Sequence, residues 1–283
     1  MRVFHISHGF VVAVTMCDVY RVAMWSNFFK RRDLIIVPMA YVILGLILYV
    51  SQDSLIYLAD DRPHGECAAL PTAEVLHGVV RGFYLSYESD RLAVLYHGNA
   101  GNACDRAPLI RAMHDAGYAV LAVEYPGYAD PAVRARGTDM LANVHDVVAH
   151  VETLPYTHVV PVGESIGSAF ASYHTTLAST SGLVLIAPFE RLSARAQRAV
   201  RIYPARLMLR QDLLVDEWAR SAPSVRIIAA ERDEVIPRRH TDNVFNALDP
   251  STTEYVIIPD TTHNTLYGHS AFYEAVTDYL QDL

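Results

Sequence analysis

Short, uninterrupted apolar runs alternate with segments of helical spacing along most of the chain. The runs predict strands at 79–85, 92–96, 119–123, 159–162, 183–187, 225–229 and 255–258. Apolar residues recurring every three or four positions predict helices at 103–116, 139–154 with Thr138 as N-cap, 168–179 and 270–283. Strands buried on both faces that alternate with helices form a mostly parallel sheet. The pattern therefore predicts an α/β fold, with function at the carboxyl ends of the strands.

One apolar run has a different character. Residues 34–50 contain no charged side chain over 17 positions, which is at the short end of a membrane span. Lys30, Arg31 and Arg32 precede this run, and the first charged residue after it is Asp53. The positive-inside rule then places the N-terminus in the cytoplasm and the remainder of the chain outside.

No small-residue cleavage site follows this run, which favours an uncleaved anchor over a removed signal peptide. The alternative is a buried core helix, in which Pro38 would be costly. We expect a cytoplasmic segment at 1–33, a transmembrane anchor at 34–51 and an α/β domain at 52–283. A start at Met24 would give a compact basic segment directly before the anchor.

Composition excludes some classes of partner. The net charge of −8 argues against nucleic-acid binding, which needs a basic surface. The three cysteines, Cys17, Cys67 and Cys104, are dispersed and odd in number, which predicts neither a disulfide framework nor a zinc site. A glycine-rich stretch at 97–102 lacks both the G-x-G-x-x-G motif and a Walker lysine, which argues against a nucleotide-binding site of the Rossmann type. No metal or organic cofactor is expected.

The motif Gly163-Glu164-Ser165-Ile166-Gly167 directly follows the apolar run at 159–162. In a nucleophile elbow, a serine of this pattern stands on a sharp strand-to-helix turn. A serine hydroxyl is a weak nucleophile at neutral pH, so it needs a base that an acid orients. On such a fold the three residues follow the order serine, acid, histidine.

The candidate acid and base follow the last two predicted strands. Asp233 comes just after the run at 225–229 and is the preferred acid, and His263 follows the run at 255–258 and is the preferred base. The alternative acids are Glu190, Glu231, Glu234 and Asp260, and the alternative base is His269.

Two backbone N–H groups are expected to bind the oxyanion. One belongs to Ile166, directly after the nucleophile, and the other to Asn99, in the turn that follows the run at 92–96. Gly98 allows the backbone to approach the substrate closely. Gly98 and Tyr128 are predicted to bind substrate.

Together these residues resemble the α/β-hydrolase superfamily, and more narrowly its membrane-anchored branch of lysophospholipid lipases and protein depalmitoylases. The resemblance covers residues 52–283. Its motifs are the stretches at 96–102, 124–128 and 163–167, with Asp233 and the pair His263-Asn264. The chain has Gly127-Tyr128-Ala129 where the branch usually has Gly-Tyr-Gly, and it lacks the cysteine-rich N-terminus of the depalmitoylases.

The resemblance also implies a short helical cap at about 189–222. Seven arginines lie there among apolar residues: Arg191, Arg195, Arg198, Arg201, Arg206, Arg210 and Arg220. One interpretation is a helix pair packed on the core with a solvated basic face. The other is a lid that meets anionic lipid headgroups or an acidic substrate.

The expected function is hydrolysis of a carboxylic ester or thioester through a Ser165–Asp233–His263 triad and an acyl-enzyme. An anchored hydrolase meets lipids in the adjoining leaflet, so an acyl lipid is the expected substrate. The alternatives are a serine peptidase on the same fold, a non-catalytic binding protein, and a soluble esterase in which residues 34–50 are core.

Overall fold

The computed structural model describes residues 32–60, 62–130 and 132–283. These residues divide into two compact units, the first ending at Ser51 and the second spanning Gln52–Leu283. Helix α2 (Asp33–Ile56) is the one helix in the described residues that is long and apolar enough to cross a membrane. Its 24 residues correspond to about 36 Å of helix, against about 30 Å of bilayer hydrocarbon. The candidate start at Met24 lies outside the described residues.

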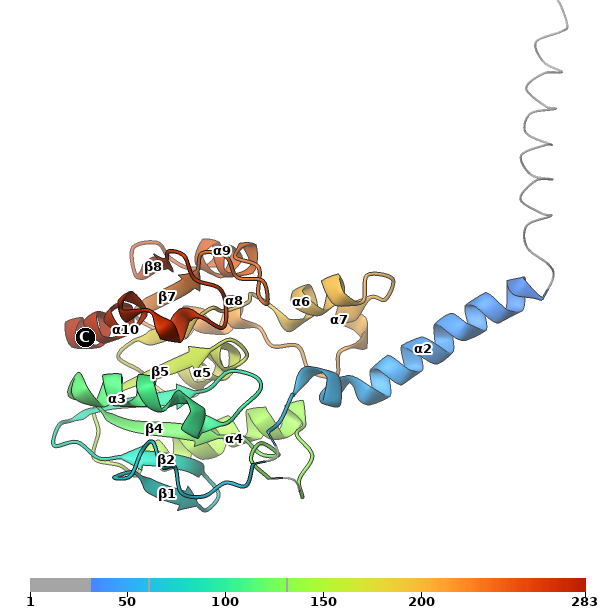
Figure 1. The fold of residues 1–283 in the computed structure, drawn as a ribbon. Helices are drawn as coiled ribbons and strands as arrows, with labels where there is room; N and C mark the ends of the chain where they lie inside the picture. The colour runs from blue at the N-terminus through green and yellow to red at the C-terminus, as the bar shows by residue number, and fades with distance from the viewer. Residues whose placement is uncertain (1–31, 61, 131) are drawn as a thin grey trace, which may run out of the picture. The chain divides into compact units, whose positions relative to one another are not determined.

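The second unit is built on an eight-stranded sheet of order β1-β2-β4-β3-β5-β6-β7-β8 (Figure 1). Strands β1 and β2 are antiparallel to their neighbours, and all remaining pairs are parallel. The strands are β1 (Glu74–His77), β2 (Arg81–Leu85), β3 (Arg91–Tyr96), β4 (Ala119–Glu124), β5 (His158–Glu164), β6 (Leu183–Ile186), β7 (Val225–Ala230) and β8 (Thr253–Ile258). The predicted α/β class with a mostly parallel sheet is confirmed. Because β3 lies between β4 and β5, the order of the strands reverses there, and such reversals open a crevice at the carboxyl ends.

Helices cover both faces of this sheet (Figure 1). Side chains alternate along β3, so Leu92 and Val94 pack into one core while Ala93 and Leu95 pack into the other. The first core also receives α4 (Gly137–Val151), α5 (Gly167–Leu177) and α9 (Arg239–Ala247), and the second receives α3 (Ala107–Asp115) and α10 (Ser270–Asp282). Burial of these strands on both sides explains their uninterrupted apolar sequences.

Between β6 and β7 the chain forms short helices in place of one long crossover helix. They are α6 (Leu192–Ala199), α7 (Ala205–Met208), α8 (Val215–Trp218) and the 3-10 turn η2 (Ala219–Ser221). An isolated antiparallel bridge joins Arg191 to Leu214 and closes the segment at its base. The arginine-rich stretch is therefore a folded excursion from the sheet.

Several local predictions were wrong. The strand expected at 79–85 begins at Arg81, because residues 78–80 turn between β1 and β2, and β1 itself was missed. The helix expected at 103–116 is divided into a 3-10 turn, η1 (Ala103–Arg106), and α3. Thr138 is not an N-cap, since α4 begins at Gly137 and the Thr138 hydroxyl bonds to Asp139.

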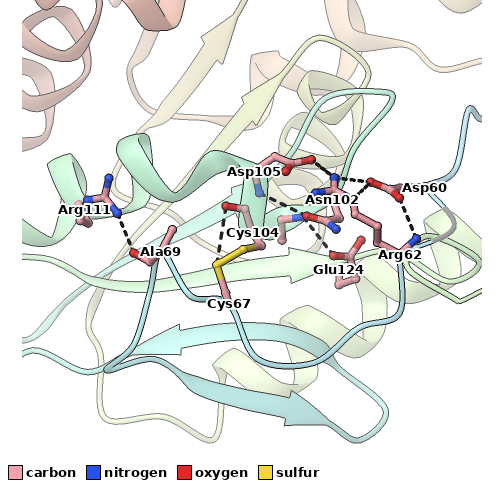
Figure 2. The surroundings of a disulfide bond; sticks show 10 residues. Asp60, Arg62, Cys67, Ala69, Asn102, Cys104, Asp105, Arg111 and Glu124 are labelled. Atoms are coloured by element: carbon pink, nitrogen blue, oxygen red, sulfur yellow. Dashed lines mark hydrogen bonds and ion pairs between the residues drawn. A yellow bond between two sulfur atoms is a disulfide. The ribbon is translucent and has the colours of Figure 1, made fainter.

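The prediction of no disulfide was also wrong. Cys67 and Cys104 form a disulfide across a Cα–Cα distance of 5.7 Å (Figure 2). The odd count misled because only Cys17 lies outside the α/β unit, which leaves an even pair within it. The bond fastens the segment after α2 to the η1 turn, and Arg62 reinforces it with ion pairs to Asp60 and Asp105 (Figure 2).

Candidate active site

Ser165 stands on a strained turn between β5 and α5. Its φ of 53° lies in the left-handed region that non-glycine residues rarely adopt. The Ser165 N–H donates to the Ile186 carbonyl of neighbouring β6 at 2.8 Å, which holds the turn against the sheet. Such strain is commonly kept where a side chain must be presented for function. The local conformation is that of a nucleophile elbow.

The two glycines of the motif are needed for close packing. A Cβ on Gly163 would lie 2.5 Å from the Gly167 carbonyl oxygen. A Cβ on Gly167 would lie 2.1 Å from the carbonyl oxygen of Tyr96, at the end of β3. Larger residues would therefore push α5 away from the neighbouring strand and displace Ser165.

Asp233 and His263 meet at the carboxyl ends of adjacent strands β7 and β8. Asp233 Oδ2 lies 2.7 Å from His263 Nδ1, and both side chains are largely buried. The other oxygen, Oδ1, accepts the N–H groups of Val235 and Ile236 at 2.9 and 2.6 Å. These bonds fix the carboxylate, which in turn orients the imidazole with its Nε2 free to serve as a base. In the described parts of the chain the Ser165 hydroxyl makes no hydrogen bond, and nucleophile–base contacts commonly tighten only when substrate binds.

The alternative acids have other partners. Glu190 accepts a hydrogen bond from the His240 ring at 2.7 Å, and Asp260 forms an exposed ion pair with Arg232. The Glu231 carboxylate accepts the Asp260 N–H. Glu234 contacts the backbone N–H of His263 at 3.4 Å but not its ring. His269 is the residue that precedes α10, and its N–H bonds to the Leu266 carbonyl.

The two predicted oxyanion donors follow the carboxyl ends of two neighbouring strands, β3 and β5. Ile166 follows the serine and directly precedes α5, and Asn99 lies in the turn after β3, the strand beside β5. In the described residues, neither backbone N–H has a hydrogen-bond acceptor. Unpaired N–H groups at such a position are suited to receive a developing anion.

The side chain of Asn99 fixes this turn to two distant segments. Its Oδ1 accepts the Tyr128 hydroxyl at 2.6 Å and the Leu58 N–H at 2.9 Å, and its Nδ2 donates to the Ile56 carbonyl at 2.6 Å. Tyr128 is fully buried. A substrate contact by Tyr128 stays a prediction, and the contact in the structure is with the turn that carries the Asn99 N–H.

A buried network that the sequence did not indicate centres on Glu164, the neighbour of Ser165. Arg106 donates to its carboxylate from Nε at 2.6 Å and from a terminal nitrogen at 3.0 Å. The Tyr267 hydroxyl and the Gly98 N–H donate to Glu164 Oε2 at 2.9 and 3.2 Å. Burial alone would raise the pKa of Glu164, but the charge of Arg106 and these hydrogen bonds lower the pKa and keep the group ionised.

Glu164 therefore joins three parts of the site. Gly98 belongs to the turn after β3 that is predicted to bind the oxyanion, called the oxyanion turn below. Glu164 belongs to the elbow, and Tyr267 to the segment that follows His263. Gly98 could not be larger, because a Cβ there would lie 2.7 Å from Glu164 Oε1. The contact of Gly98 in the structure is with Glu164, and its predicted role in substrate binding stays a prediction. The only signal in the sequence was a charged residue beside the serine, without indication of its partner.

A second buried cluster, formed by His97, Glu124 and Tyr125, adjoins the oxyanion turn. His97 has no exposed surface, and its Nε2 lies 3.2 Å from Glu124 Oε1. Its ring packs on Tyr125 at a centroid distance of 4.2 Å, and the Tyr125 hydroxyl donates to the His97 carbonyl. Within the described residues, no group of three His, Cys, Asp or Glu side chains is arranged to hold a metal ion.

Sequence comparison finds a family model and an uncharacterized relative that match this chain. A family model described as serine aminopeptidase S33 matches residues 87–222. An uncharacterized protein of Mycobacterium tuberculosis H37Rv is 26% identical over 251 residues, covering 81% of this chain and 87% of that protein.

Solved structures with the same fold are named as esterases or lipases in several cases. Est1E from Butyrivibrio proteoclasticus has a TM-score of 0.59 at 17% identity, covering 75% of this chain and 98% of its own. The Pyrococcus furiosus esterase Pf2001 has a TM-score of 0.56 at 18% identity, covering 72% and 87%. A monoacylglycerol lipase of Paleococcus ferrophilus has a TM-score of 0.54 at 14% identity, covering 72% and 98%. At these identities the likeness concerns the fold.

Proposed function

We propose that this chain, which has the fold of the α/β-hydrolases, is a serine hydrolase of that superfamily and cleaves a carboxylic ester or thioester of an acyl lipid. The observation that carries the proposal is the 2.7 Å contact between Asp233 Oδ2 and His263 Nδ1, taken together with the strained elbow at Ser165. The esterases and lipases among proteins of the same fold are consistent with this chemistry.

Ser165 Oγ attacks the acyl carbonyl while His263 Nε2 takes its proton. Asp233 accepts a hydrogen bond from the Nδ1–H group, remains ionised, and stabilises the imidazolium that forms. The carbonyl oxygen becomes negative and is received by the N–H groups of Asn99 and Ile166. His263 then protonates the leaving oxygen or sulfur, and water releases the acyl group from Ser165 by the same steps in reverse.

The position of the site supports a lipid substrate. Asn99 Nδ2 donates to the Ile56 carbonyl and Oδ1 accepts the Leu58 N–H, and Ile56 lies only six residues beyond Val50, the last residue of the apolar run. If residues 34–50 span the bilayer, the segment that bonds to Asn99 is the one that directly follows the anchor in the sequence, and an anchored hydrolase has acyl lipids available to it.

The Cys67–Cys104 disulfide supports a catalytic unit on the non-cytoplasmic side. Disulfides persist in oxidising compartments and are rare in the cytosol. The basic residues before the anchor, Lys30 to Arg32, favour the same orientation. The two arguments are independent, since one concerns redox chemistry and the other concerns insertion.

A peptidase is the second candidate, because the matching family model is described as a serine aminopeptidase. A peptidase would use the same serine, acid and base. Turnover of a short p-nitrophenyl ester and of a peptide amide, measured in parallel, separates the two. We expect ester turnover to dominate, and faster amide cleavage would favour the peptidase.

The proposal is tested with a fluorophosphonate, which labels an activated serine covalently. We expect the full chain to be labelled and to hydrolyse monoacylglycerol or lysophospholipid, and Ser165→Ala to do neither. Ser172→Ala is the matched control, because Ser172 is a buried serine of α5 whose hydroxyl has no partner among the described residues. Absence of labelling in a folded wild type would favour a non-catalytic binding protein.

A further inference from the structure

The cap presents an exposed surface of basic and apolar side chains that runs from the end of α6 into α7. We define this cap ridge as Arg198, Arg201, Ile202, Arg206 and Leu207. Ile202 and Leu207 expose 68% and 83% of their surface, the latter the highest exposure of any large apolar residue in the described chain. Large apolar side chains exposed together in this way commonly mark a binding surface.

The cap ridge carries uncompensated positive charge. Four of the seven cap arginines are engaged: Arg191 with Asp216, Arg195 with the Val235 carbonyl, Arg210 with Asp53 and Arg220 with the Ala247 carbonyl. In the described residues, the guanidinium groups of Arg198, Arg201 and Arg206 make no ion pair and no hydrogen bond. No acidic residue occurs in the sequence between Glu190 and Asp212. This surface is therefore basic on a chain whose net charge is −8.

Buried side chains and hydrogen bonds hold the turn of the cap ridge in place. Tyr203 and Ala205 are buried beneath it, with 4% and 2% exposure. The Gln197 side chain donates to the Tyr203 carbonyl at 2.9 Å and accepts the Ala205 N–H at 3.0 Å. These contacts orient the turn so that Ile202 and Leu207 point away from the core.

Hydrogen bonds connect the ridge to the end of the apolar helix. The Gln52 side chain donates to the Met208 carbonyl and accepts the Arg210 N–H at 3.3 and 2.8 Å. Gln52 lies two residues beyond Val50, where the apolar run ends. At its other end the cap contacts the acid loop, because Arg195 bonds to the Val235 carbonyl and the Val235 N–H bonds to Asp233. The cap is thus bonded both to Gln52, at the start of the α/β unit, and to the loop that carries the proposed acid.

We propose that the cap ridge docks on an anionic phospholipid leaflet, with Ile202 and Leu207 entering the interface and the three arginines contacting lipid phosphates. This inference rests on the proposed anchoring of residues 34–50 in the membrane. Aliphatic side chains flanked by arginines suit the boundary between headgroups and acyl chains. An arginine close to an anionic surface strengthens binding about fivefold, so three arginines favour anionic over neutral lipid by about 100-fold.

The test uses the full chain reconstituted in vesicles of phosphatidylcholine alone or mixed with phosphatidylglycerol. An NBD fluorophore is attached at Leu207→Cys in a Cys17→Ser background, which leaves the Cys67–Cys104 disulfide intact. We expect a blue-shifted emission that lipid-borne quenchers reduce, strongly with phosphatidylglycerol and weakly without it. A label at Val79→Cys, an exposed position in the β1–β2 turn, is the matched control and is expected to respond to neither lipid.

A second experiment removes the positive charges of the cap ridge. The triple variant Arg198→Gln, Arg201→Gln, Arg206→Gln is expected to lose the phosphatidylglycerol-dependent shift, whereas Arg232→Gln keeps it. Emission typical of water in both vesicles, or a shift that the triple variant retains, would overturn the proposal. So would a shift produced by soluble polyglutamate but not by vesicles, which would indicate an acidic protein partner.

Fluorophosphonate labelling of the same samples separates this inference from the proposed function. Labelling of Ser165 without insertion of the ridge refutes only the docking. Insertion without labelling supports the docking and refutes only the hydrolase.

Discussion

Arg106 Nε lies 2.6 Å from Glu164 Oε2, so a largely buried ion pair adjoins the proposed nucleophile in the chain. The pair is more than a local contact, because the same carboxylate also holds Gly98 and Tyr267. Its loss is therefore expected to loosen the elbow, the oxyanion turn and the segment after the histidine together.

Replacing Arg106 with Gln would leave the Glu164 carboxylate buried without its counter-charge. We expect this to lower the free energy of unfolding by about 3 kcal/mol, the lower end for breaking a buried pair. Urea denaturation measures the change. Arg232→Gln removes an exposed pair with Asp260 and is expected to cost less than about 1 kcal/mol. Similar losses for both variants would contradict the assigned importance of Glu164.

Asp233→Asn keeps the shape of the acid but removes its charge and favours the wrong tautomer of His263. We expect kcat for a p-nitrophenyl ester to fall by about 10⁴-fold with little change in thermal stability. Glu234→Gln is the matched control, since Glu234 adjoins Asp233 in sequence and contacts only the His263 backbone. An equal loss in both variants would remove the distinction between the two carboxylates.

Tyr128→Phe removes the hydroxyl that donates to Asn99 Oδ1 at 2.6 Å. Because Tyr128 is buried, we expect a positioning effect, with kcat reduced about tenfold and KM changed by less than about twofold. Steady-state kinetics on one ester separates the possibilities. A raised KM with unchanged kcat would instead assign Tyr128 to substrate binding, as the sequence suggested.

Removal of the disulfide by Cys67→Ser with Cys104→Ser is expected to lower the free energy of unfolding by about 4 kcal/mol, from the loop entropy of a 37-residue separation. In native membranes, alkylation of the denatured protein should add one label before reduction, at Cys17, and three after it. Three labels without a reductant would place the catalytic unit in a reducing compartment and contradict the proposed orientation.

His174 provides a pH dependence. Burial lowers the pKa of His174, which contacts the Tyr96 hydroxyl, to about 4. In the unfolded chain its pKa is about 6.5, so between these values the unfolded state binds the proton and the folded state does not. The contribution of neutral His174 to the free energy of unfolding is fully present above about pH 6.5. It declines by up to about 3 kcal/mol as the pH falls toward 4.

His174→Gln removes this titration and should flatten the pH profile of unfolding in that range. His158→Gln, which alters an exposed histidine paired with Asp90, is the control and should leave the profile unchanged. A profile that is equally steep in His174→Gln would assign the acid sensitivity to other groups.

The success of the sequence in finding the sheet has a physical cause. Strands β3 to β7 are buried on both faces, so each appears as an apolar run that needs no knowledge of its neighbours. Strand β1 was missed because it is four residues long and partly exposed at the sheet edge. The order of the strands depends on contacts between distant segments, which local patterns do not contain.

The candidate site likewise has features that local sequence patterns predict and features that depend on contacts between distant segments. Ser165, Asp233 and His263 could be proposed from the sequence because each follows a strand that the pattern reveals. The choice of Asp233 over Glu231 and Glu234 rested on position alone, whereas the ring contact depends on the conformation of one turn. The pairing of Glu164 with Arg106 and of Cys67 with Cys104 requires the placement of segments far apart in the chain.

The bonds from Asn99 to Ile56 and Leu58 set a limit on how far the protein can be shortened for solution work. A fragment trimmed to begin after Leu58 would discard both partners of the Asn99 amide. It would keep every strand of the sheet and still lose the support of its oxyanion turn, so low activity in such a fragment would reflect the trimming. Fragments that begin at Gln52 retain these bonds and the contacts of Gln52 with the cap. The last turn of α2 thus belongs to the α/β unit as well as to the proposed anchor.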